Sequence, residues 1–100
     1  MFDFDMERNG SVMNLALKGV LDTKTAPDLG DAILPVIDEV TEIHFDFAEL
    51  EYLTSAGLRT ILEVQQEMED KDGELTLTNV NNDIMDIFEM TGFIDVLTIV

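Results

Sequence analysis

Two short segments of the chain alternate strictly between apolar and polar residues, and this pattern limits the possible architecture most. In residues 42–47, Glu-Ile-His-Phe-Asp-Phe, the three apolar side chains share one face of a strand. Residues 74–79 repeat the pattern, with two leucines on one face and two threonines on the other. Strands that are buried on both faces have continuous apolar runs instead. We therefore predict a sheet with helices packed on one face only, which gives a two-layer fold.

Three further segments are predicted to be strands. Residues 2–7 and 12–21 both have strand character, and the Asn9-Gly10 pair between them is typical of a tight hairpin turn. Residues 96–99, Val-Leu-Thr-Ile, are predicted to form the last strand. The chain therefore begins with a hairpin and ends with a strand.

The first helix is predicted over residues 26–40. Its apolar residues have the i, i+3, i+4, i+7 spacing of a single stripe: Ala26, Leu29, Ile33, Val36, Ile37 and Val40. Thr25 is the expected N-cap, and Pro27 lies in the first turn, where its missing N–H costs nothing. Pro35 removes an interior hydrogen bond, so we expect a kink or a split near Leu34.

Two more helices follow in the predicted order. Residues 55–71 form the second helix, and its predicted buried face consists of Leu58, Ile61, Leu62 and Met68. The third is short, with Asn81 or Asn82 as its cap and Gly92 as its stop; its predicted inward residues are Ile84, Ile87 and Phe88. The order β-β-α-β-α-β-α-β implies right-handed crossovers and at least partly parallel pairing. We therefore predict an α/β fold with a mixed sheet, as one domain over residues 1–100.

The composition excludes several functions. Twenty-two acidic residues against five Lys and Arg give a net charge of −17 over 100 residues. A surface this negative repels phosphate backbones and anionic lipid, so we expect no direct contact with nucleic acid or membrane and a partner with a basic face. There is no cysteine, which excludes disulfides and thiolate chemistry. The acidic N-terminus and the lack of a long apolar stretch predict a cytoplasmic location.

Catalytic constellations are mostly absent from the sequence. The one histidine, His44, lies on the polar side of a strand, where a solvated role is the simplest interpretation. No glycine-rich phosphate loop occurs, and no cofactor or metal is predicted. Asp22, Asp46 and Glu49 lie near predicted strand ends, where they would either cluster or form part of a solvated acidic surface.

The segment from Glu49 to Arg59 differs from the rest. A strand is predicted to end at Phe47, a short loop to follow, and a helix to begin at Ser55, where free N–H groups and the helix dipole favour an anion. Serine at that position is either an N-cap, worth about 1 kcal/mol, or a phosphoacceptor whose phosphate rests on the helix start. Gly57 costs about 1 kcal/mol relative to alanine in a helix, which suggests that another backbone comes close.

Residues 52–59, Tyr-Leu-Thr-Ser-Ala-Gly-Leu-Arg, resemble the phosphorylation loop of STAS domains, the anti-sigma factor antagonists of bacteria. Other pieces of the chain resemble the signatures of the same family and occur in the family's order: residues 17–22, 25–29, 45–47, 77–80 and 91–97. Single pieces of this kind are weak evidence, whereas a full set in order at the right spacing is strong. The resemblance covers nearly the whole chain and implies the two-layer STAS fold.

The resemblance also implies a mechanism. An unphosphorylated antagonist binds an anti-sigma factor and so releases a sigma factor for transcription. The anti-sigma factor is itself a Ser/Thr kinase of the histidine-kinase-like ATPase type, and it breaks the complex by phosphorylating the antagonist. The chain is then expected to be a binding switch and not an enzyme.

The resemblance assigns roles to individual residues. Ser55 matches the phosphoacceptor, and Asp22 and Thr23 match the loop beside it. Thr54 stands where many members carry Asp, and it offers a second hydroxyl. The other residues expected around the phosphosite are Ala56, Gly57 and Arg59. The residues expected to bind the partner are Asp22, Thr25, Glu51, Leu53 and Ser55.

The size of the charge indicates how a phosphate would act. Phosphorylation adds about −1.5 to −2 charges, a small part of −17, and charges beyond about 8 Å are screened at physiological salt. The effect must therefore be local. Arg59 lies one helical turn from Ser55, where it would either partly neutralise a phosphate or simply pair with Glu63 or point to solvent.

Three alternatives remain open from the sequence. Free-standing STAS domains also serve as subunits of lipid-transport ABC complexes or of stress-signalling scaffolds. A nucleotide-binding domain would need a phosphate loop, and a receiver-type phosphoacceptor would need a lysine placed beside several acidic residues. Neither feature is evident here. The sequence leaves the oligomeric state open.

Overall fold

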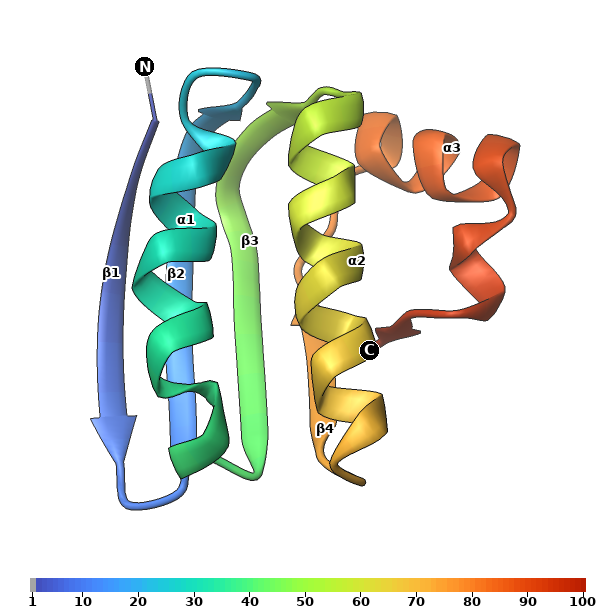
Figure 1. The fold of residues 1–100 in the computed structure, drawn as a ribbon. Coiled ribbons are helices and arrows are strands. Elements are labelled where there is room, and N and C mark those ends of the chain that lie inside the picture. Colours follow the sequence, from blue (N-terminus) through green and yellow to red (C-terminus); the bar gives the residue numbers. More distant parts are fainter. Residues whose placement is uncertain (1) are drawn as a thin grey trace.

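The computed structural model describes residues 2–100. Figure 1 shows one sheet with helices packed in front of it. In chain order the elements are β1 (Phe2–Asn9), β2 (Val12–Leu21), α1 (Ala26–Ile33), the 3₁₀ helix η1 (Leu34–Glu39), β3 (Glu42–Leu53), α2 (Ser55–Asp70), β4 (Glu74–Thr78), α3 (Asn82–Thr91), the 3₁₀ helix η2 (Phe93–Asp95) and β5 (Thr98–Ile99). The predicted order of strands and α-helices is confirmed.

The sheet is mixed, as predicted. Its five strands follow the order β1-β2-β3-β4-β5. The β1–β2 hairpin is antiparallel, whereas the pairs β2–β3, β3–β4 and β4–β5 are parallel. The predicted turn lies at Gly10 and Ser11, and Gly10 has a φ of 61°, a backbone conformation that glycine adopts without strain.

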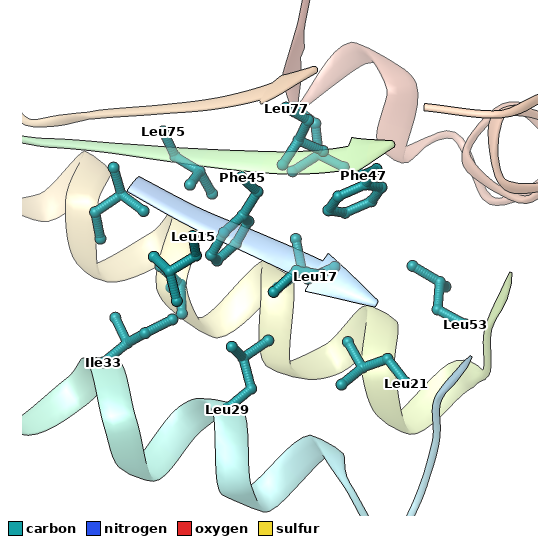
Figure 2. Close-up of a cluster of buried hydrophobic side chains, with 14 of the residues drawn as sticks. Leu15, Leu17, Leu21, Leu29, Ile33, Phe45, Phe47, Leu53, Leu75 and Leu77 are labelled. Atoms are coloured by element: carbon teal, nitrogen blue, oxygen red, sulfur yellow. The ribbon is translucent and has the colours of Figure 1, made fainter. Parts of the chain in front are cut away.

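The two-layer arrangement is confirmed by which side chains are buried. Helices α1 and α2 lie side by side over one face of the sheet (Figure 1). Figure 2 shows that leucines and phenylalanines of β2, β3 and β4 meet side chains of α1 there. The opposite face carries the polar residues of the alternation. One exception is Thr76, expected to face solvent but only 8 % exposed.

The first helix splits as Pro35 predicts. Helix α1 ends at Ile33, and the chain continues as the 3₁₀ helix η1 from Leu34 to Glu39. Proline has no N–H for the interior of an α-helix, whereas the start of a new short helix tolerates it. The single helix over residues 26–40 is therefore two helical segments.

The predicted end of the third strand is wrong. Strand β3 does not stop at Phe47 but continues to Leu53, and its second half pairs with β2. The register between the two strands shifts twice, because β3 contains one residue more than β2 at each of two places. The first lies between the pairs Ala16–Asp46 and Lys18–Glu49, and the second between Gly19–Leu50 and Val20–Tyr52. Such bulges break the period of two, so residues 48–53 lack the alternation that marks a strand.

The C-terminal prediction also needs correction. Strand β5 contains only Thr98 and Ile99, because η2 occupies residues 93–95 and Val96 is 47 % exposed. The predicted caps of α3 are correct: Asn81 accepts a hydrogen bond from the N–H of Ile84, and Gly92 ends the helix at a φ of 81°. Two residues expected to be buried on α2 and α3, Leu62 and Ile87, are only half-buried.

Candidate functional site

The candidate site lies where β3 passes into α2, and a single backbone carbonyl anchors it. The carbonyl oxygen of Leu21, at the end of β2, accepts a hydrogen bond of 3.0 Å from the N–H of Thr54. The N–H of Leu58 then donates to the carbonyl of Thr54 at 2.9 Å, which starts α2. The end of β2 therefore fixes the position at which the helix begins.

Gly57 confirms the predicted close approach of a second backbone. A Cβ atom at this position would lie 2.7 Å from the carbonyl oxygen of Leu21 and 2.9 Å from its Cγ atom. Side chains do not tolerate contacts this short, so only glycine fits here. The absence of a side chain allows the first turn of α2 to rest on the end of β2.

Ser55 is the first residue of α2 and is exposed. The prediction that serine could be the N-cap is wrong, because Thr54 holds that position with an extended backbone. Within residues 2–100 the Ser55 hydroxyl has no hydrogen-bond partner, and no side chain caps the helix. The first N–H groups of α2 therefore remain available to an acceptor, together with the positive end of the helix dipole.

Thr54, the second candidate hydroxyl, is in a different environment. Its Oγ1 atom is buried and lacks a hydrogen-bond partner in the described residues. Threonine at an N-cap ordinarily accepts a hydrogen bond from the first turn, but here it accepts none. The two neighbouring hydroxyls thus differ in access, since Ser55 faces solvent and Thr54 Oγ1 does not.

The loop between β2 and α1 lies beside this junction and is held by Asp22. The Oδ1 atom of Asp22 accepts hydrogen bonds from the Thr25 hydroxyl at 3.0 Å, the Thr25 N–H at 3.1 Å and the Lys24 N–H at 3.0 Å. The Thr25 hydroxyl in turn accepts from the N–H of Asp22 at 2.8 Å. Hydrogen bonds from the Thr25 side chain and backbone lower the pKa of Asp22.

These bonds change the interpretation of two predicted partner-binding residues. Asp22 and Thr25 use their polar groups to shape the loop, so their first role is structural. Thr25 occupies the predicted N-cap position of α1, but its side chain binds the loop and does not cap the helix. Thr23, between them, is exposed.

The other predicted contact residues divide clearly. Glu51 is exposed, whereas Leu53 is 1 % exposed and belongs to the core, so Leu53 cannot contact a partner in this structure. Tyr52 was not among the predicted contacts, yet it is 46 % exposed only three residues before Ser55. The bulges in β3 explain both results, because they change which side chains of this segment point inward.

Asn81 is a positioning residue that sequence reasoning identified only as a possible cap. Its Nδ2 atom donates to the carbonyl oxygens of Leu50 at 3.1 Å and Glu51 at 3.2 Å, while its Oδ1 atom caps α3. One side chain therefore joins the start of α3 to the strand that leads into Ser55.

Arg59 lies one turn beyond Ser55 on the exposed side of α2. Arg59 does not pair with Glu63, which was one of the alternatives, since no carboxylate oxygen of the described residues lies within 4.0 Å of its guanidinium nitrogens. Three of the five basic side chains, Arg8, Lys18 and Lys71, are engaged away from the site. Arg59 and Lys24, both close in sequence to the candidate site, have no ion-pair partner in residues 2–100.

The carboxylates near the strand ends do not form a cluster. Asp22 is bound within its own loop, and Asp46 accepts from the Asn79 side chain and the Ala48 N–H, each at 2.9 Å, which lowers the pKa of Asp46. Glu49 lies opposite Lys18 on β2. No group of three or more possible metal ligands occurs within residues 2–100. In the same residues, no helix combines the length and apolar character that crossing a bilayer requires.

The fold and the site define a class: a small α/β domain with helices over one sheet face and an exposed serine at the β3–α2 junction. Solved structures with the same fold include the anti-sigma factor antagonist SpoIIAA in its unphosphorylated form, with a TM-score of 0.82 and 22% identity, covering 98% of this chain and 87% of that one. SpoIIAA of Bacillus in the phosphorylated form matches with a TM-score of 0.81 and 23% identity, covering 98% and 91% of the two chains.

The sequence comparisons agree with the fold. The family model described as "Mlab, STAS domain" matches residues 4–99, so the chain belongs to the STAS domain family. Among curated relatives, the anti-sigma-B factor antagonist of Bacillus subtilis is 22% identical over 95 residues, which cover 95% of this chain and 87% of the relative.

Proposed function

We propose that this chain is an anti-sigma factor antagonist that works as a phosphorylation switch. In its unphosphorylated form it binds a kinase-type anti-sigma factor in the cytoplasm and frees the sigma factor. Phosphorylation of Ser55 by that kinase ends the binding. The chain itself catalyses no reaction and touches no nucleic acid in this scheme.

The observation that carries the proposal is the environment of Ser55. The side chain is exposed, its hydroxyl has no internal partner, and it stands at the start of a helix whose position is fixed by Leu21. A kinase needs a hydroxyl it can reach, and the buried Oγ1 atom of Thr54 does not meet that condition. The structure therefore favours Ser55 over Thr54 as the acceptor.

The effect of the phosphate is local. It adds about −1.5 to −2 charges to a chain that already carries −17, so the overall field changes little. A dianion at the centre of a contact adds bulk and repulsion, particularly next to exposed Glu51. Arg59 has no internal ion-pair partner, and at the i+4 position of the same helix it lies where it can partly neutralise the phosphate.

The relatives support the same function. The Bacillus subtilis relative is named an anti-sigma-B factor antagonist, and SpoIIAA is known in both phosphorylated and unphosphorylated forms. The proposal extends that pair of states to this chain, with Ser55 as the residue that differs between them.

The proposal is tested with the purified kinase-type anti-sigma factor of the same organism. After incubation with ATP, we expect intact-mass spectrometry to show one added phosphate, about 80 Da, mapped to Ser55, no change for Ser55→Ala, and an unchanged yield for Thr54→Val. In pull-down assays, wild type should bind and Ser55→Asp should not. Equal binding by wild type and Ser55→Asp contradicts the switch.

The competing function is that of a STAS subunit in a lipid-transport ABC complex or a stress-signalling scaffold. The family model that matches is described as Mlab and not as an anti-sigma factor antagonist, so the family match alone does not select between these roles. No phosphorylation at any residue, together with stable binding to an ABC ATPase, would favour this second function.

A further inference from the structure

A groove runs between α1 and α2 beside the candidate phosphosite. Its volume is about 380 Å³, and its floor is formed by small or apolar residues: Ala26, Gly30, Leu34, Ala56 and the Thr60 side chain. The two helices lie side by side in Figure 1, in front of the sheet. The groove is therefore a surface feature of the helical layer, separate from the uncovered face of the sheet.

Gly30 at the floor of this groove has no structural explanation in packing. A Cβ atom there would lie 3.7 Å from Thr60 Cγ2 and 3.9 Å from Leu34 Cδ1, which are ordinary contacts. Its φ is not positive, so alanine could adopt the same backbone. Glycine in a helix interior is less stable than alanine, and α1 has only eight residues. Gly30 is itself buried, and its missing Cβ atom makes the groove deeper at this point.

Gly57 shows the contrast. There a Cβ atom would lie 2.7 Å from a backbone oxygen, so the fold itself demands glycine. The fold makes no such demand at Gly30. Of these two helical glycines, Gly57 is required by packing, whereas Gly30 is buried at the bottom of the groove, where its missing side chain leaves space.

The rim of the groove indicates the charge of its occupant. Asp31 and Glu63 line it, both are exposed, and neither has an ion-pair partner among the described residues. Arg59 is the one basic residue of the lining. Two carboxylates against one guanidinium, on a chain of net charge −17, favour a cationic group from the partner.

The groove is continuous with the proposed switch. Thr23, from the loop held by Asp22, lines one end of it, and Ala56, the residue after Ser55, lines the same region. A segment lying in the groove would therefore extend directly past the Ser55 side chain. A phosphate on Ser55 would then stand at the edge of that contact.

From these observations we infer that the α1–α2 groove is the docking site for a segment of the anti-sigma factor, an inference that rests on the proposed function. The segment places a large apolar side chain, such as leucine or phenylalanine, over Gly30. A lysine or arginine next to that side chain reaches Asp31 or Glu63. In this arrangement the groove provides most of the binding affinity, and phosphorylation of Ser55 at its end determines whether the complex forms.

The first test fills the floor of the groove. Gly30→Ala should raise Tm by about 4 °C, because alanine is the better helix former, yet weaken binding to the purified kinase-type anti-sigma factor at least threefold in isothermal titration calorimetry. Gly30→Leu should weaken it at least tenfold. The matched control is Ala16→Leu, which fills a hollow on the uncovered sheet face and should leave affinity unchanged.

The second test concerns the rim. Asp31→Lys should weaken binding at least tenfold, whereas Glu67→Lys, an exposed α2 position that does not line the groove, changes the net charge equally and should have a much smaller effect. Equal losses in these two variants would indicate a general charge effect and overturn the docking site.

The outcomes separate this inference from the proposed function. If wild type binds the anti-sigma factor and both Gly30 variants bind equally well, the groove is not the docking site and the proposed function stands. If folded wild type does not bind the anti-sigma factor at all, both are wrong. The melting curve of Gly30→Ala identifies any loss of binding that arises from unfolding, since this variant should be more stable than wild type.

Discussion

Replacing Gly57 with alanine should destabilise the protein, although alanine is the better helix former. The added Cβ atom would lie 2.7 Å from the Leu21 carbonyl oxygen, whereas ordinary contacts begin at 3.4 Å. The difference, 3.4 − 2.7 = 0.7 Å, must come from movement of α2 or of β2. Because the same oxygen accepts the N–H of Thr54 at 3.0 Å, movement that relieves the contact also strains this hydrogen bond.

The magnitude follows from three opposing contributions. Overpacking costs about 1–3 kcal/mol, and weakening the hydrogen bond from Thr54 costs up to about 1 kcal/mol. Alanine returns up to about 1 kcal/mol in helix propensity. We therefore expect the free energy of unfolding to fall by about 1–3 kcal/mol, which corresponds to a decrease in Tm of about 5–15 °C for a domain of this size.

Thermal and urea unfolding followed by circular dichroism measure this change, with Gly30→Ala as the matched control. Both variants replace a helical glycine by alanine, but the Gly30 variant meets only ordinary contacts and should be more stable than wild type. The two substitutions should thus shift Tm in opposite directions. An increase in Tm for Gly57→Ala would refute the argument that the end of β2 sets the start of α2.

Three further predictions concern polar groups around the same junction. Thr54→Val removes a buried hydroxyl without a partner, so we expect stability to be unchanged or to rise by up to about 1 kcal/mol; a clear loss in urea unfolding would show that this hydroxyl has a partner in solution. Asn81→Ala removes the cap of α3 and two hydrogen bonds to β3, and should cost about 1–3 kcal/mol, whereas wild-type stability would contradict the role of this side chain. Thr25→Ala should raise the pKa of Asp22 toward its ordinary value, with Asp46 unchanged as the control, in an NMR titration of the carboxyl groups. A carboxyl group whose pKa is lower in the folded state stabilises the fold above the unfolded-state pKa, near 3.8, and this stabilisation is lost as pH falls through the folded-state pKa. Thr25→Ala should therefore reduce the acid dependence of the free energy of unfolding below about pH 4. An unchanged Asp22 pKa in this variant would exclude the Thr25 hydrogen bonds as the cause of the shift.

The parts of the fold that were predicted correctly depend on local pattern. Alternation in residues 42–47 and 74–79 identified two strands, although Thr76 in the second is buried, and the spacing of apolar residues identified the helices. Pro35 and Gly92 marked a split and an end, because the backbone limits of proline and glycine do not depend on distant neighbours.

The errors occur where distant parts of the chain decide the local structure. Strand β3 continues past Phe47 because β2 offers it a ladder of hydrogen bonds, and the two bulges in that ladder remove the alternation. The same bulges bury Leu53 and expose Tyr52, so the predicted partner contact at Leu53 was wrong. No periodicity in the sequence reports a bulge that arises from pairing with another strand.

The site shows the same division. The sequence placed Ser55 at the start of a helix, and Gly57 indicated a close backbone approach that the structure confirms. The sequence did not decide whether Ser55 or Thr54 is the phosphoacceptor, because it does not show which of two adjacent hydroxyls is exposed. Their difference in exposure is set by the packing of the junction against the end of β2.

By itself, then, the sequence determined the two-layer α/β class, the order of its elements and the position of the helix that carries Ser55. These follow from side-chain periodicity and from the backbone limits of glycine and proline, which act over a few residues. The tertiary structure decided which hydroxyl is accessible, which carboxylate is held in a loop and where a groove lies open between α1 and α2. Those properties depend on contacts between residues far apart in the chain, since exposure is fixed only when the elements pack together.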